Sequence, residues 1–166
     1  LEAHAAVHRE HPRSVAVGRI VWPRGGGFLR YIGSRGAAKL RPGDPVPPWY
    51  FVTGNASIER KDLPPGDTFD GSIPGWGGED LDLGLALARV GVGFVHAHDA
   101  AAFHHFTGTL SGHLERTRSY GRYSLPVLVG KHPELRRILR LNLLDSAIWR
   151  ALVSDGVFQP VSTLAR

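Results

Sequence analysis

The chain has 166 residues, enough for one domain with a substantial core, since a chain of about 150 residues buries roughly 70% of its unfolded surface. Its 20 lysines and arginines exceed its 15 acids, and the net charge of +5 is compatible with phosphate-bearing ligands, anionic lipids or nucleic acid, and equally with an ordinary solvated basic surface. The lack of cysteine excludes disulfides, Cys-ligated zinc and thiol catalysis, and no apolar stretch reaches the ~18 residues of a membrane-spanning helix, so a soluble, cytoplasmic chain is expected.

The N-terminal part of the chain predicts a helix followed by a strand. Small, apolar and histidine residues recur at helical spacing up to a proline, and His4 and His8 lie one turn apart. Such a pair can bind a metal, but because no third ligand lies nearby we expect both histidines to face solvent. Residues 14–22 are mostly β-branched and apolar, which predicts a strand buried on both faces of a covered sheet. Residues 23–48 are rich in Gly, Pro and Arg and are predicted to form a long irregular connection, either a functional lid or a disordered loop tip.

Further elements predict an α/β fold. A short helix is expected near residues 28–40, and a second strand at residues 49–53 that breaks at a Gly-Asn turn. Acids in the first turn, an arginine in the last and leucines on one face predict a largely buried helix over residues 79–90, closed by a glycine. A third strand region follows at residues 93–106.

Residues 110–166 predict a basic, amphipathic helical extension, distinct from residues 1–109. Apolar residues recur there at helical spacing, with arginines on the opposite side. Two interpretations stay open for this pattern: packing helices with a solvated face, or peripheral contact with a membrane through residues 134–153. The second interpretation would place the protein at the inner face of the membrane.

The run GWGGEDLDLG, residues 75–84, combines more features than a helix start needs. Glu79 and Asp80 lie where free backbone N–H groups and the helix dipole favour ionised carboxylates, and such a carboxylate can accept a proton from a bound hydroxyl. Gly77 and Gly78 let the backbone come close to a substrate, and Trp76 offers a flat apolar face that suits the C–H face of a sugar ring. Each residue alone fits an ordinary helix start, but together they predict a saccharide-acceptor site.

Three segments carry a family resemblance: FVTGNASIERKDL, FDGSIPGWGGEDLDLGLALARVGVGFVH and AAAFHHF. Together they resemble the acceptor half of a family 2 type glycosyltransferase with the GT-A fold, over about residues 1–122. The GWGGED run is similar to the motif of the β-galactosyltransferases and their bacterial relatives. The resemblance implies a partial GT-A fold, with a few mixed-sheet strands flanked by helices, in which residues 1–109 form the acceptor and metal half.

The resemblance also implies roles for the residues of this run. Asp80 matches the general base of an inverting transfer from a nucleotide-sugar donor to a saccharide or other hydroxyl acceptor. Glu79 would orient the acceptor or the base, and Trp76, Gly77 and Gly78 would line the acceptor pocket.

Two more parts of the site follow from the resemblance. Thr53, Gly54 and Asn55 match a strand-end loop beside the donor sugar, although an ordinary turn fits the same residues. His104 matches a ligand of the divalent cation, manganese or magnesium, with His105 as the competing choice. Such a cation would neutralise the developing charge of the departing diphosphate.

One departure from the family pattern defines the rival hypotheses. Family members carry an Asp-x-Asp metal motif in their nucleotide-binding half, and the only match here, at residues 80–82, lies in a helix start. We therefore expect a fragment that is inactive alone, although its parent would transfer sugar. The rivals are a non-catalytic carbohydrate-binding or scaffold protein, and a metal-dependent hydrolase built on His96, His98, His104 and His105. Nucleic-acid binding is not expected, because the arginines are dispersed and no known module is present.

Overall fold

The structure is a computed structural model that describes residues 1–41, 44–66 and 68–145. The chain divides into two compact units, residues 1–125 and 126–166, which are described separately. The first unit contains the sheet and every residue of the predicted site. The predicted division into residues 1–109 and 110–166 stays a prediction.

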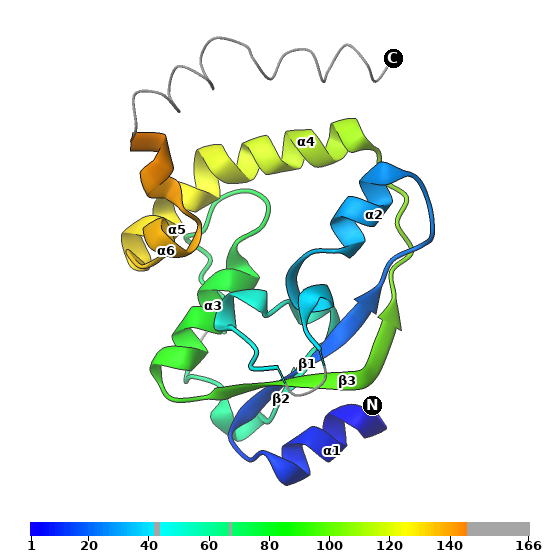
Figure 1. The fold of residues 1–166 in the computed structure, drawn as a ribbon. Coiled ribbons are helices and arrows are strands. Elements are labelled where there is room, and N and C mark those ends of the chain that lie inside the picture. The colour runs from blue at the N-terminus through cyan, green and yellow to red at the C-terminus, as the bar shows by residue number, and fades with distance from the viewer. Residues whose placement is uncertain (42–43, 67, 146–166) are drawn as a thin grey trace. The chain divides into compact units, whose positions relative to one another are not determined.

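A three-stranded mixed sheet forms the centre of the first unit (Figure 1). The central strand β1, Ser14–Val21, pairs antiparallel with β2, Ala56–Ile58, and parallel with β3, Gly93–Phe103. Val15, Ala16 and Val17 are fully buried, so the predicted strand with two covered faces is confirmed. The predicted α/β class, with a mixed sheet flanked by helices, is also confirmed and is consistent with part of a GT-A fold.

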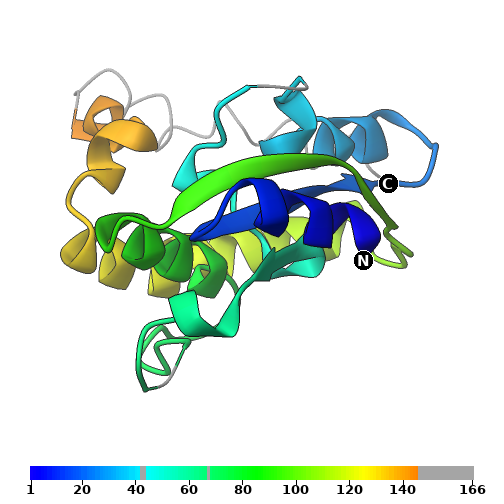
Figure 2. The ribbon, with the colours of Figure 1, turned by 90° about the horizontal axis from the view of Figure 1, so that it is seen from below.

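Helices cover both faces of this sheet (Figure 2). On one face, Val15 and Val17 pack with Leu83 and Leu87 of helix α3, Glu79–Arg89. On the other face the alanines of the sheet pack against helix α1, Glu2–Glu10. Because successive side chains of a strand point to opposite faces, one apolar run in β1 supplies both cores.

Helix α3 has the bounds that its sequence predicts. It begins after Gly78, whose φ is 109°, and the chain leaves it through Gly91, whose φ is 79°, so both turns use the left-handed region that favours glycine. Within the helix, a Cβ added at Gly84 would lie 2.5 Å from the carbonyl oxygen of Pro48. Gly84 therefore lets the helix approach the backbone of residues 48–50 closely, which anchors α3 against the sheet.

The predicted strand at residues 49–53 is wrong. Residues Pro48–Tyr50 and Thr53–Asn55 form two short 3₁₀ turns, and the strand starts only at Ala56. The physical reason is the proline pair before it, since Pro48 lacks an N–H for a sheet ladder and its fixed φ suits the first position of a helical turn. Phe51 then turns inward and is buried in the core.

The remaining elements of the first unit are short helices and turns between and after the strands. Helix α2, Gly27–Gly33, and a 3₁₀ turn at Gly36–Lys39 take up the region where a short helix was predicted. A 3₁₀ turn at Arg60–Asp62 follows β2. Helix α4, Leu110–Ser119, follows β3 and continues into a π-helical turn at Tyr120–Ser124.

The second unit begins within helix α5, Leu125–Lys131. Helix α6, Leu135–Ile138, is followed by a 3₁₀ turn at Leu141–Asp145, and Leu128 and Leu135 are fully buried. Among the described residues, no helix is both long and apolar enough to cross a bilayer. The predicted membrane contact through residues 134–153 lies partly outside the described residues and stays a prediction.

Candidate functional site

The loop before α3 depends on its glycines. Gly75, Gly77 and Gly78 have φ values of 80°, 81° and 109°, a region that side chains with a Cβ rarely adopt. Three left-handed residues in four positions turn the chain sharply into the helix and carry Trp76 outward between them. The glycines therefore set the path of the loop.

Trp76 lies exposed at the head of this loop, beside helix α4. The indole is 53% exposed, and the guanidinium carbon of Arg116 lies 5.4 Å from its ring centroid. The π-helical turn packs along the same loop, because Ser124 Oγ donates a 2.7 Å hydrogen bond to the carbonyl oxygen of Pro74. Burial raises the pKa of the neighbouring Tyr120, whose ring would contact a Cβ added at Gly77. The predicted acceptor residues thus share one surface with α4.

Asp80 is held by Thr53, which lies 27 residues earlier in the chain. The backbone N–H of Thr53 donates to Asp80 Oδ1 over 3.2 Å, and its hydroxyl donates to the same oxygen over 2.8 Å. Among the described residues no hydrogen bond reaches the other oxygen, Oδ2. The carboxylate is therefore oriented by one oxygen and open to a further donor at the other. Glu79, next to it, is exposed.

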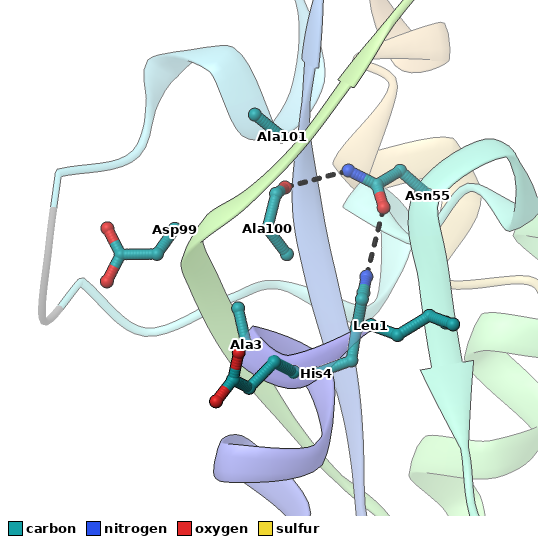
Figure 3. Close-up of a pocket in the computed structure, with 8 residues that line it drawn as sticks. Leu1, Ala3, His4, Asn55, Asp99, Ala100 and Ala101 are labelled. Atoms are coloured by element: carbon teal, nitrogen blue, oxygen red, sulfur yellow. Dashed lines mark hydrogen bonds between the residues drawn. The ribbon is translucent and has the colours of Figure 1, made fainter.

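Gly54 and Asn55 pack the Thr53–Asn55 turn against the sheet. A Cβ added at Gly54 would lie 3.6 Å from the Ile20 side chain of β1. The Asn55 amide nitrogen donates to the carbonyl oxygens of Arg19 and Ala100 over 2.9 and 2.8 Å, and its oxygen lies 3.0 Å from His4 Nε2 (Figure 3). Both amide hydrogens are therefore used, so a hydrogen bond from a donor-sugar hydroxyl to Asn55 would go to the second lone pair of its oxygen.

The histidines of α1 face the sheet, so the expectation that they face solvent is wrong. His4 is 9% exposed and lies 3.0 Å through Nδ1 from Ser57 Oγ, and His8 Nε2 lies 2.8 Å from the same hydroxyl. The direction of these hydrogen bonds starts at the Asn55 oxygen, which can only accept, so His4 Nε2–H donates to it. His4 Nδ1 then accepts from the Ser57 hydroxyl, and the Ser57 oxygen accepts from His8 Nε2–H. A hydrogen-bonded chain thus ties α1 to β2 and β3.

His104 and His105 follow the end of β3, beside the end of β1. The His104 N–H donates to the Val21 carbonyl oxygen over 2.9 Å, and its ring centroid lies 4.3 Å from that of Trp22. Both histidines line a cavity of about 520 Å³ at the carboxyl ends of these parallel strands, where ligands commonly bind in α/β sheets. Within residues 1–41, 44–66 and 68–145, no group of three or more His, Asp or Glu side chains could hold a metal ion. The hydrolase built on four histidines therefore lacks support.

The sequence reasoning overlooked an aromatic cluster next to His104. Phe106 lies 5.7 Å from Trp22 between ring centroids, and Phe28 of α2 lies 5.8 Å from Phe106 and 5.4 Å from His113 of α4. The signal that could have found it is the pair of aromatic residues shortly after the parallel strands, Trp22 after β1 and Phe106 after β3, because the ends of adjacent parallel strands meet at one edge.

One comparison with known proteins found a similar chain. The chain is 38% identical over 58 residues to an uncharacterized glycosyltransferase, YfnE, of Bacillus subtilis (strain 168). The matched segment is 34% of this chain and 15% of that protein, so the chain corresponds to a small part of its relative's length. No protein-family model matches the chain, and no solved structure matches it. The similarity indicates a glycosyltransferase-like chain and carries no information on donor, acceptor or mechanism.

Proposed function

We propose that this chain is the acceptor-binding part of an inverting glycosyltransferase of family 2 type, which transfers a sugar from a nucleotide-diphosphate sugar to a saccharide or other hydroxyl acceptor. The observation that carries the proposal is the Asp80 carboxylate, oriented through Oδ1 by Thr53 and open at Oδ2. The similarity to a glycosyltransferase supports the class of reaction. The GWGGED run supports the assignment of the acceptor side.

Asp80 is the general base in this proposal. The acceptor hydroxyl oxygen attacks the anomeric carbon of the donor while the bond from that carbon to the diphosphate oxygen breaks. The hydroxyl proton passes to Asp80 Oδ2, and the electron pair leaves with the diphosphate. A single displacement of this kind inverts the anomeric configuration. Because two hydrogen bonds fix Oδ1, Oδ2 keeps one position relative to the bound acceptor, and this orientation favours the transfer.

Trp76 provides the surface for the acceptor ring. Its indole is half exposed, and stacking with the Arg116 guanidinium holds it in one orientation. A sugar ring resting on the open part of the indole would lie beside the backbone of Gly77 and Gly78. Glu79, exposed next to Asp80, would then accept hydrogen bonds from neighbouring acceptor hydroxyls.

A manganese or magnesium ion would need ligands from outside the described residues. His104 or His105 could supply one imidazole, but the described residues contain no group of three His, Asp or Glu placed for a metal. The site as described does not fit a complete metal centre, so the mechanism above takes no step through the cation. The ion, its ligand and the donor-side role of Thr53, Gly54 and Asn55 remain parts of the proposal.

The test is sugar transfer by the full-length protein that contains this sequence, assayed with a panel of nucleotide sugars with and without manganese. Asp80→Asn keeps the size of the side chain but removes the base, and we expect turnover to fall by about a thousandfold or more with donor binding unchanged. The matched control is Asp99→Asn, which changes an exposed carboxylate beside α1 and should leave turnover unaltered. Full turnover in Asp80→Asn would refute the assignment. Saccharide binding without transfer from any donor would favour a carbohydrate-binding module instead.

Thr53 is a positioning residue in this scheme. Thr53→Val removes the hydroxyl but keeps the backbone N–H, so we expect kcat to fall about tenfold with little change in KM, because ground-state binding of the acceptor does not use this bond. Thr53→Ser restores the hydroxyl and should restore kcat. A rise in KM at constant kcat would show that Thr53 acts on binding and not on the base.

A further inference from the structure

One segment near the N-terminus contains basic residues and no acid. Residues 11–43 contain seven lysines and arginines and no acid, whereas the rest of the chain has 13 basic residues and 15 acids. The segment therefore carries a net charge of +7. It comprises β1, α2 and the turns that follow, so the charge surrounds the carboxyl end of the central strand.

Three of these arginines converge on one cavity. Arg19 of β1, Arg24 of the connecting loop and Arg30 of α2 line a cavity of about 410 Å³, and no acidic residue lines it. In the described part of the chain none of the three forms an ion pair. Three unpaired guanidinium groups at one cavity repel one another, so an anion bound between them would remove an unfavourable interaction.

The wall of the cavity is formed by the end of β1 packed against α2. The Trp22 side chain lies against α2 so closely that a Cβ added at Gly33 would be 3.2 Å from Trp22 Cβ. This contact fixes the end of β1 against the helix that carries Arg30. Ser34 Oγ also lines the cavity, but it donates to the Tyr31 carbonyl oxygen over 2.8 Å, so the arginines are the cationic donors available to a ligand.

From this geometry we infer a binding site for a phosphate-bearing ligand of the diphosphate class at Arg19, Arg24 and Arg30. A guanidinium group presents a planar pair of N–H donors that matches phosphate oxygens, and three of them suit a group with several such oxygens. The segment 21–24 lines both this cavity and the cavity of His104 and His105, so the bound diphosphate lies next to the candidate site. The choice of a diphosphate rests on the proposed function, whose donor carries one, but binding of a diphosphate can be measured without any transfer of sugar.

The test is binding of inorganic pyrophosphate to the 166-residue chain, measured by calorimetry at two salt concentrations. Replacing Arg24 and Arg30 with Gln should weaken binding at least about tenfold, which corresponds to the loss of one charge-assisted hydrogen bond. The control, Arg118→Gln with Arg122→Gln, removes the same charge from exposed residues of α4 and the π-helical turn and should change affinity less than about twofold. Circular dichroism spectra identical to that of the wild type establish that the variants fold. The conservative variant Arg30→Lys keeps the charge but loses the paired donors, and intermediate binding is expected.

Two outcomes would overturn the inference: no pyrophosphate binding by the wild type, or an equal loss in the cavity variant and the α4 control, which would indicate a response to net charge alone. Competition experiments then identify the source of the phosphate. Displacement of pyrophosphate by uridine diphosphate supports a soluble nucleotide ligand. Displacement by vesicles of phosphatidylcholine with phosphatidic acid, lost in the Arg24 and Arg30 variant, supports a lipid phosphate. Vesicle binding that is unaffected by that variant counts against the site.

Discussion

Asn55→Ala tests the hydrogen-bonded chain that joins α1 to the sheet. The substitution removes three hydrogen bonds, to the carbonyl oxygens of Arg19 and Ala100 and to His4 Nε2. The Arg19 carbonyl lies in an exposed part of the network and regains water, whereas the other two groups lie in a partly buried one. Each of those two contributes about 1–1.5 kcal/mol, so the free energy of unfolding should fall by about 2–3 kcal/mol. For a chain of this length the midpoint of thermal unfolding should fall by about 5–10 °C.

The assay is urea unfolding followed by circular dichroism, with two further variants. Asn142→Ala changes an exposed asparagine and should stay within about 0.5 kcal/mol of the wild type. Asn55→Asp places a carboxylate oxygen against two carbonyl oxygens and should destabilise the chain more than alanine does. If Asn55→Ala unfolds at the same urea concentration as Asn142→Ala, the network does not contribute to stability and the reasoning fails.

Two further predictions concern the loop and the sheet. Gly77→Ala should lower the free energy of unfolding by about 1–2 kcal/mol in the same assay, because the φ of 81° at this position strains any residue with a Cβ. Gly121→Ala is the control and should be neutral or stabilising, since Gly121 has open space at its Cβ and no positive φ. Equal changes in the two variants would refute the left-handed loop. Burial lowers the pKa of His96, with the positive charges of His98 and Arg19 adding to the effect and the Arg41 backbone and Asp44 opposing it. The unfolded chain therefore binds a proton at His96 more readily than the folded chain. The contribution of His96 to the free energy of unfolding is full above about pH 6.5 and is lost as the pH falls toward the folded pKa. His96→Gln should reduce the change in unfolding free energy between about pH 7.5 and pH 5.5, and an unchanged pH dependence would contradict the assignment.

Several features of the fold could be predicted from the sequence because their causes are local. The buried strand β1 follows from a β-branched apolar run, and α3 follows from its periodic leucines, its first-turn acids and the glycines at both ends. Local signals failed at residues 49–53, where aromatic and β-branched residues suggest a strand but the preceding prolines form 3₁₀ turns.

The candidate site divides in the same way. The GWGGED run identified the position of Asp80, because a helix start and its glycines are adjacent in the sequence. The partner of Asp80 could not be predicted, since Thr53 reaches it only after both turns pack on the sheet. Trp22 and His104 are likewise 82 positions apart and meet because β1 and β3 pair in parallel.

The sequence by itself therefore determined the elements of this protein whose signals lie within one turn of chain: the central strand, the main helix and its glycine-rich entry. Only the tertiary structure decided which side chains meet. It placed His4 and His8 against Ser57, used both amide hydrogens of Asn55, and brought three arginines to one cavity. The physical reason is that such contacts depend on the packing of whole elements across the sheet, which no spacing along the chain encodes.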